Sequence, residues 1–216
     1  MKRKAMVLVA HADDETLGAG GLIQKLVKAD WEVSVVFITN GILDVRGLIE
    51  DNREDAKNAC MLLGVPNCYF LDYKDQYFDT YAIADMANSV AQLGLDPDLI
   101  ITHAETDLNL DHRITADIAR IIGRPKKKPI AILACEVPST SFWNAHPFPA
   151  NYFVDITNEI DTKIEAFSLY KNELQEYPHP WSKKGLKLLA EYHGMQAGYQ
   201  YAEAYQLVRG YENLLL

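Results

Sequence analysis

Apolar residues along this chain occur in two alternating patterns, short continuous runs and longer stretches with helical spacing. Residues 5–10 (AMVLVA) are apolar throughout, as expected for a strand that is buried on both faces. Further strands are predicted at residues 32–39, 68–71, 98–102 and 129–137. Helices are predicted between them, at residues 16–30, 49–63, 81–93 and 113–122. Strands separated by helices of this length imply right-handed crossovers, and therefore a parallel sheet.

The pattern changes after Val137. A loop, an edge strand and two helices are predicted there, at residues 138–149, 152–156, 157–170 and 183–197. No internal repeat or low-complexity linker divides the chain. We therefore predict a single domain over residues 1–216, of the α/β class, with a mostly parallel twisted sheet and helices on both faces.

Composition and charge narrow the function classes. The chain has 216 residues, of which 49% are hydrophobic, enough to bury a sizeable core without disulfides. Its formal net charge of −9 argues against nucleic acid as a partner, because phosphate binding needs clustered Lys and Arg. The basic run at residues 126–128 lies between two prolines and is interpreted as a solvated loop.

Cysteine usage and apolar run lengths bear on the cellular location. The chain has 3 cysteines without CxxC spacing, which suggests a reducing compartment. The apolar run at residues 5–10 is too short for a signal-peptide core, and no stretch reaches the ~18 apolar residues of a membrane span. We therefore expect a cytoplasmic protein without a membrane span.

One edge of the predicted sheet collects polar side chains. In an open parallel sheet, ligands bind outside the carboxyl ends of the strands. The residues that follow the predicted strands at this edge are rich in His, Asp, Asn and Glu, and they are residues 11–14, 39–41, 72, 103, 107–112, 136 and 139–141. The opposite edge offers no such set, so we expect the functional site at the carboxyl edge.

Three of these residues can form a metal site. A hydrolytic zinc site commonly has three His or carboxylate ligands and one water. His11 and Asp14 lie one turn apart at a strand-to-helix junction, and His112 can join them if the first and fourth predicted strands are neighbours. Asp13 is then suited to take a proton from an activated water, and Asp111 is suited to hydrogen-bond a ligand histidine.

Two structural interpretations compete with the metal site. Residues 13–15 can cap the following helix, since carboxylates favour helix N-termini, although this leaves His11 unexplained. Residues 18–21 (GAGG) resemble a dinucleotide-binding loop, but Ile23 leaves the GxGxxG pattern incomplete and the glycines fall inside the helical pattern. We interpret these glycines as a point of close packing between helix and sheet.

Several short motifs follow one another along the chain. Residues 11–15 read HADDE and are followed directly by TLGAGG. The later motifs are NRE at residues 52–54 with LG at 63–64, DLIITH at 98–103, DLNLDHR at 107–113, and a block from Gly194 to AEAY at 202–205. In this order they resemble the PIG-L/LmbE family of N-acetylglucosaminyl deacetylases, whose first motif is AH-P-DDE. The resemblance spans nearly the whole chain.

The resemblance implies a Rossmann-like fold with zinc at the carboxyl ends of the strands. It implies His11, Asp14 and His112 as the metal ligands, and Asp13 as the general base. Zinc is the expected cofactor, although sites of His and carboxylate also accept iron, manganese or cobalt. The implied partner is a small N-acetylated amino sugar or glycoconjugate, and assembly into a homo-oligomer is consistent with the family.

Further positions are implied to bind substrate. Arg53 and Asp72 look like positions that hold sugar hydroxyls in family members. Trp143 belongs to residues 136–143, which resemble a stretch that lines the acceptor pocket in one subgroup, and its ring could stack on a sugar. An aromatic loop residue also commonly packs on the core, so both interpretations of Trp143 stay open.

Two departures from the family pattern affect the expected chemistry. Ala12 replaces the proline of the first motif, which changes loop stiffness more than chemistry. Asn109 stands where many bacterial members carry a histidine that steadies the oxyanion. An amide donates a hydrogen bond but carries no charge. The polarising role is therefore either reduced at Asn109 or passed to His179 or His103.

The sequence thus predicts an enzyme that hydrolyses a linear amide bond, a metal-dependent N-deacetylase acting on an N-acetylated amino sugar. Two alternatives belong to other classes: a nucleotide- or NAD-binding Rossmann-type protein, and a non-catalytic sugar-binding protein. The incomplete glycine motif argues against the first. A general base beside metal ligands argues against the second, because a non-catalytic sugar-binding protein does not need one.

Overall fold

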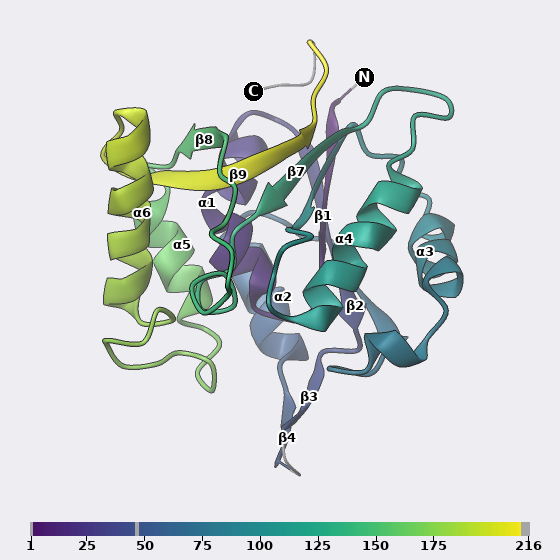
Figure 1. The fold of residues 1–216 in the computed structure, drawn as a ribbon, viewed down its shortest axis with the longest axis horizontal. Helices are drawn as coiled ribbons and strands as arrows, with labels where there is room; N and C mark the ends of the chain where they lie inside the picture. The colour runs from purple at the N-terminus through teal and green to yellow at the C-terminus, as the bar shows by residue number, and fades with distance from the viewer. Residues whose placement is uncertain (1, 46–47, 213–216) are drawn as a thin grey trace.

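The computed structural model describes residues 2–45 and 48–212, and its centre is a seven-stranded sheet with the order β5-β2-β1-β6-β7-β9-β8 (Figure 1). The strands are β1 (Lys4–Val9), β2 (Glu32–Thr39), β5 (Cys68–Tyr73), β6 (Leu99–His103), β7 (Ala131–Cys135), β8 (Tyr152–Asp155) and β9 (Ala202–Arg209). The strands from β5 to β7 in this order run parallel, β9 is antiparallel to β7, and β8 is antiparallel to β9. The predicted α/β fold with a mostly parallel, Rossmann-like sheet is confirmed.

Helices cover both faces of this sheet. One face carries α1 (Asp14–Lys28), α2 (Arg53–Leu62), α5 (Ile160–Phe167) and α6 (Lys183–Ala197). The other carries α3 (Ile83–Gln92), α4 (Leu110–Ile122) and the short 3-10 turn η1 (Phe78–Thr80), seen at the right of Figure 1. No helix in residues 2–45 or 48–212 combines the length and apolar character needed to cross a membrane.

Strand β1 is apolar from Ala5 onward because both of its faces are covered. Val7 and Val9 belong to the buried cluster beneath α1, whereas Met6 and Leu8 belong to the cluster beneath α3 and α4. Successive side chains of a strand point to opposite faces, so a central strand covered on both sides needs an apolar residue at every position. This arrangement explains the uninterrupted run from which the strand was predicted.

The glycines of α1 allow the helix to pack closely on its neighbours. A Cβ atom on Gly18 would lie 2.5 Å from the Sγ of Cys135 in β7, and one on Gly21 would lie 2.6 Å from the Cγ2 of Ile156. Both glycines lie inside the helix and not at the exit of β1. The packing interpretation of the GAGG stretch is therefore confirmed.

A buried ion pair fastens α1 and α5 to β9. The Glu203 carboxylate accepts hydrogen bonds from the backbone N–H groups of Gly21 and Leu22, each at 2.8 Å. It also accepts hydrogen bonds from Lys163 Nζ and the Tyr205 hydroxyl, each at 2.6 Å. Since Glu203, Lys163 and Tyr205 are all buried, the network satisfies polar groups that would otherwise be costly to remove from water.

The structure corrects the prediction of a helix over residues 49–63. The first part of that range belongs to strand β4 (Leu48–Asp51), which pairs antiparallel with β3 (Ile42–Val45), and α2 begins only at Arg53. Ile49 fits helical spacing, but its side chain is exposed and adds nothing to a buried helix face. Apolar spacing alone therefore placed the start of the helix too early.

Strand β9 has no counterpart among the predicted elements, where residues 202–205 counted only as a motif. It lies between β7 and β8, so β8 is an edge strand, as predicted for residues 152–156. The partners of β9 come from segments far away in the sequence. A pairing of this kind depends on side-chain burial between elements, and local residue patterns do not encode it.

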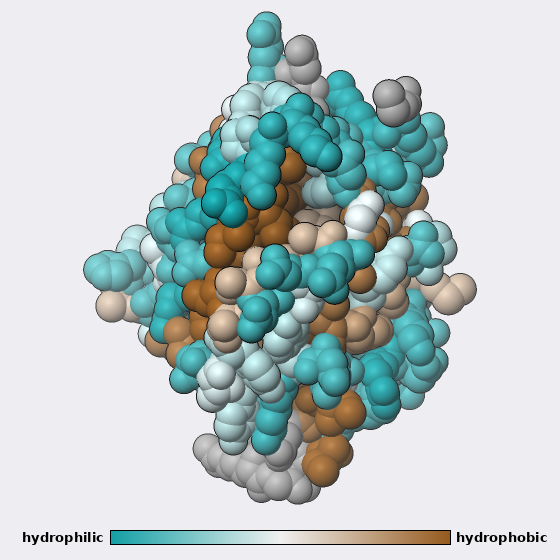
Figure 2. Space-filling view, turned by 90° about the vertical axis from the view of Figure 1, so that its right-hand side faces the viewer, coloured by the Kyte–Doolittle hydropathy of each residue, from teal (hydrophilic) through white to brown (hydrophobic). Residues whose placement is uncertain are grey.

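An apolar hollow lies on the face that carries α3 and α4, in the upper part of Figure 2. A cavity of about 330 Å³ lies there near the C-terminal ends of both helices, with Val90, Leu95, Ile100 and Ile122 in its lining. Met6, near the start of β1, also lines it. The cavity is therefore at the opposite end of the strands from the polar residues that follow them.

Candidate metal centre

Three side chains meet at the carboxyl ends of the central strands. His11 lies in the connection between β1 and α1, Asp14 is the first residue of α1, and His112 lies in the first turn of α4. Strands β1 and β6 pair in parallel, as required for His112 to reach the other two. The local chain thus brings His11 and Asp14 together, and the sheet topology adds a histidine from 101 residues away.

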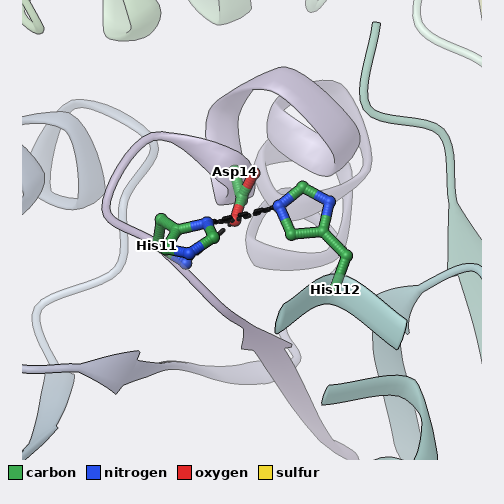
Figure 3. Close-up of side chains that lie close together, drawn as sticks. All are labelled: His11, Asp14 and His112. Carbon is green, nitrogen blue, oxygen red and sulfur yellow. Dashed lines mark hydrogen bonds and ion pairs between the residues drawn. The ribbon is translucent and has the colours of Figure 1, made fainter. Parts of the chain in front are cut away.

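The ligand atoms of these side chains form a nearly equilateral triangle (Figure 3). His11 Nδ1 lies 3.2 Å from His112 Nε2 and 3.3 Å from Asp14 Oδ2, and the third side, from His112 Nε2 to Asp14 Oδ2, is 3.4 Å. Atoms bound at about 2.0–2.1 Å to a tetrahedral zinc ion lie about 3.3–3.4 Å apart. The buried triangle therefore has the donor atoms and the spacing of a three-ligand metal site.

His11 is also held from its other side. Its Nε2 lies 2.9 Å from Asp75 Oδ1 and 3.3 Å from Asp111 Oδ2. Because Nε2 contacts these carboxylates, Nδ1 is the ring nitrogen that faces the triangle. Carboxylates commonly orient metal-binding histidines in this way. The structure thus brings the predicted Asp111 against His11, and it adds Asp75, which no sequence motif indicated.

His112 has a carboxylate neighbour of its own. Its Nδ1 lies 3.2 Å from Asp107 Oδ2, and the Thr140 hydroxyl donates to the same oxygen at 3.0 Å. The other oxygen of Asp107 accepts the backbone N–H of Asn109 at 2.8 Å. Asp107 belongs to the DLNLDHR motif, but only the structure shows that it lies behind His112.

His103, at the end of β6, forms a wall of the site. Its ring stacks on that of His112, with centroids 3.8 Å apart. Its Nε2 accepts the backbone N–H of Ala10 at 2.9 Å and lies 3.3 Å from Asp14 Oδ2. The bond from Ala10 uses the lone pair of Nε2, so this nitrogen is not a donor for a reacting group.

The electrostatics of the cluster favour positive charge at its centre. Burial acts to lower the pKa of His112, but Asp14 and Asp107 outweigh it and raise the pKa to about 9. Burial acts in the same way on His11, yet its bonds to three neighbouring aspartates leave its pKa well above the usual value. The carboxylates thus stabilise protons on the imidazoles, and a divalent cation would satisfy the same excess of negative charge.

Asp13 lies next to the triangle. Its side chain makes no cap hydrogen bond with α1, so the helix-cap interpretation of residues 13–15 does not describe it. Instead, the Glu15 carboxylate accepts the backbone N–H of Asp13 at 3.1 Å. Burial raises the pKa of Asp13 well above its usual range, and the nearby charges of Asp14 and Glu173 raise it further. A buried carboxylate with a raised pKa beside a metal-type cluster is a typical proton-transfer group.

Asn109 and His179, the two other predicted catalytic residues, lie in different settings. Asn109 is the N-cap of α4, and its Oδ1 accepts the backbone N–H of Asp111 at 2.8 Å. This bond engages the amide oxygen, so the amide nitrogen is the group that Asn109 can offer to a substrate. His179 is half-buried and lies edge-on to Trp143, with ring centroids 5.7 Å apart, while its Nδ1 accepts the backbone N–H of Trp181 at 3.1 Å.

Arg53 and Asp72, predicted to hold sugar hydroxyls, are both exposed. Arg53 begins α2 and pairs with Asp51, the Nη2 to Oδ2 distance being 2.6 Å. The shorter predicted strand had placed Asp72 after its end, but Asp72 lies within β5. Asp75, beyond the end of β5, is the carboxylate that reaches His11. The roles of Arg53 and Asp72 toward a sugar stay predictions.

Trp143 is 63% exposed, which excludes the interpretation that it packs into the core. It lines a cavity of about 790 Å³ between the loop after β7 and helix α6, together with Tyr177, Leu188 and Tyr192. Glu136 and His193 also line this cavity and bond to each other at 2.7 Å. Trp143 is therefore available to contact a ligand.

The fold and the site together define an α/β protein with a candidate metal site of the kind used in hydrolysis. Residues 6–122 match the model of the PIG-L family, described as GlcNAc-PI de-N-acetylase. This match includes all three corners of the triangle and Asp13. The chain belongs to the PIG-L family.

The proteins that resemble this chain are named for different activities, among them deacetylases and a hydratase. Diacetylchitobiose deacetylase of Thermococcus kodakarensis is 24% identical over 227 residues, covering 96% of this chain and 84% of that protein. The structure of GalB, the 4-carboxy-2-hydroxymuconate hydratase of Pseudomonas putida, has a TM-score of 0.78 at 23% identity and covers 99% of this chain and 100% of GalB. The zinc-inhibited form of teicoplanin deacetylase Orf2 has a TM-score of 0.74 at 16% identity, with coverage of 97% and 100%. These structural likenesses show the fold, which by itself does not select a reaction.

Proposed function

We propose that this chain is a metal-dependent deacetylase, with zinc as its ion, that hydrolyses the acetamide group of an N-acetylated amino sugar or glycoconjugate. The observation that carries the proposal is the triangle of His11, Asp14 and His112 with Asp13 beside it. Membership of the PIG-L family, and the deacetylase name of a relative from Thermococcus, support the same reaction.

His11, Asp14 and His112 would hold the ion, which supplies Lewis-acid chemistry that polarises a carbonyl and lowers the pKa of a water molecule. Asp13 would accept a proton from the attacking water and later return it to the nitrogen of the departing amine. Asp13 is buried, so the proton that it accepts would be shielded from bulk water between the two steps.

In addition to the metal ion and Asp13, the reaction needs a hydrogen-bond donor that stabilises the negative charge developing on the acetamide oxygen. We propose that Asn109 donates from its amide nitrogen, since its oxygen is engaged by the backbone of Asp111. A neutral amide stabilises an oxyanion less than a charged imidazolium does. His179, on the neighbouring loop beside Trp143, is the second candidate for this role or for protonating the amine.

The rest of the substrate would lie against the cavity lined by Trp143. Aromatic side chains are prominent in its walls, among them Tyr177 and Tyr192, and the lining within the described part of the chain includes no Lys or Arg. Such a surface suits a neutral ring with an apolar face, as in a sugar, better than a phosphate or carboxylate. By family resemblance, Arg53 and Asp72 would bind sugar hydroxyls.

Replacing Trp143 with alanine is expected to raise KM for the best substrate by about tenfold, the value of one aromatic contact, with kcat within about twofold. Trp143→Phe, which keeps a ring at this position, is the matched control and is expected to retain most of the affinity. Steady-state kinetics on both variants measure the effect. An unchanged KM in Trp143→Ala would remove this ring from the proposed substrate site.

An amine-release assay over a panel of N-acetylated sugars and chito-oligosaccharides tests the function itself. We expect amine release from at least one member, loss of activity with a chelator, and recovery with added zinc. Sugar binding without amine release would instead indicate a non-catalytic binding protein. Thermal stabilisation by NAD, with no release, would favour the nucleotide-binding class.

We also propose that residues 1–216 form one domain. Both core clusters pack on the same sheet, and β9 and α6 near the C-terminus contribute to that sheet and to its covering layer. This continuity supports a single folding unit. Thermal unfolding followed by circular dichroism is expected to show one cooperative transition.

A further inference from the structure

Asp13 has an unusual backbone conformation for a residue with a side chain. Its φ is 146° and its ψ is −31°, in a region that glycine adopts freely and other residues rarely do. Strained residues of this kind cluster at functional sites and persist only where surrounding contacts hold them. The contacts of Asp13 therefore show what fixes the orientation of the proposed base.

Both backbone polar groups of Asp13 are engaged. Its carbonyl oxygen accepts the backbone N–H groups of Thr16 and Leu17, each at 3.0 Å, and the Thr16 hydroxyl at 2.7 Å. These bonds belong to the start of α1. Its N–H group donates to Glu15 Oε2 at 3.1 Å. The carbonyl is thus held by the helix, whereas the N–H group depends on one side chain.

Glu15 is held in turn by a tyrosine from a distant segment. The hydroxyl of Tyr170, which follows α5, donates to Glu15 Oε1 at 2.6 Å across 155 residues of sequence. Glu15 and Tyr170 are each 0% exposed. With one oxygen bonded to Asp13 and the other to Tyr170, the Glu15 carboxylate cannot rotate without leaving a buried donor unpaired.

We propose that Glu15 and Tyr170 are positioning residues that set the orientation of Asp13. Tyr170 acts on Glu15, and Glu15 acts on the backbone N–H of Asp13, so neither needs to touch substrate or metal. This inference rests on the proposed function, in which Asp13 transfers the proton. It assigns a catalytic consequence to a buried carboxylate and a buried hydroxyl that lie outside the ligand triangle.

The chain offers a matched control for a purely structural role. Tyr205 is also 0% exposed, and its hydroxyl also donates to a buried glutamate, Glu203, at 2.6 Å. That pair belongs to the network that joins β9 to α1 and α5. Tyr170→Phe and Tyr205→Phe therefore each remove one hydroxyl from one buried tyrosine–glutamate bond, and only the first bond leads to Asp13.

Tyr170→Phe is expected to lower kcat by about tenfold or more, with metal content retained and KM within about twofold. Tyr205→Phe is expected to keep kcat within about twofold of the wild type, even if its thermal midpoint falls as far as that of Tyr170→Phe. Equal losses of kcat in the two variants would overturn the proposal. If Tyr170→Phe does not fold, Glu15→Gln replaces it, because an amide offers one acceptor oxygen to the two donors that bond Glu15.

A double-mutant cycle separates this inference from the proposed function. In an Asp13→Asn background, Tyr170→Phe is expected to lower the residual rate by less than about twofold, because its effect passes through Asp13. A full tenfold loss in that background would overturn the positioning role while leaving Asp13 as the base. Wild-type activity in Asp13→Asn alone would instead exclude Asp13 as the base, whereas absence of amine release from every substrate by the wild type would contradict the proposed function.

Discussion

Replacing Asp13 with asparagine is expected to lower kcat by about 10²–10⁴-fold, the usual contribution of a general acid–base group. Asparagine has nearly the same shape and tolerates positive φ, so the strained backbone should persist. It cannot accept a proton from water or return one to an amine. The measurement is the steady-state rate of amine release on the best substrate, with metal content determined on the same sample.

The metal content and the thermal midpoint of Asp13→Asn are expected to stay near those of the wild type, because Asp13 is not a corner of the triangle. Asp85→Asn is a matched control, since Asp85 is an exposed carboxylate in the first turn of α3, on the other face of the sheet. Its activity should be unchanged. Loss of metal from Asp13→Asn would show that Asp13 is a ligand, and a wild-type rate would exclude it as the base.

His112→Ala is expected to abolish stable metal binding and to lower activity by about 10³-fold or more. The variant removes one of the three ligand atoms and leaves His11 and Asp14, which are too few for a hydrolytic site. It also leaves the buried Asp107 without its imidazole partner, so a fall in thermal midpoint should accompany the loss. Elemental analysis after dialysis measures the metal, and calorimetry measures the stability.

His146→Ala is the control for this substitution, because His146 is an exposed loop histidine. It is expected to keep both metal and activity. Chelation of the wild type, followed by addition of zinc, provides the same test without a mutation. Activity that survives both chelation and the loss of His112 would rule out a metal-dependent reaction.

Local sequence was sufficient for the parts of the site that lie close together in the chain. His11, Asp13 and Asp14 follow an apolar run that is recognisable as a strand buried on both faces, and the helical spacing starts directly after them. A strand-to-helix junction restricts where such neighbours can point. Only one long-range assumption was needed for His112, that the first and fourth predicted strands are neighbours, and the parallel pairing of β1 with β6 satisfies it.

The supporting groups could not be found in this way. Edge strand β5 extends to Tyr73, two residues further than predicted, so the carboxylate beyond its end is Asp75 and not the exposed Asp72. Tyr170 follows α5, and its bond to Glu15 spans 155 residues. A buried hydroxyl and a solvated one look identical in a sequence, because burial is a property of the packed molecule.

What the sequence by itself determined is therefore the alternation of strands and helices and the presence of His and Asp residues at the strand exits, because both follow from residue spacing. The tertiary structure decided which carboxylates contact each histidine and where β9 joins the sheet. It also decided that the Trp143 side chain is exposed. These features depend on contacts between distant segments, whose free energy is gained only when the whole chain has packed.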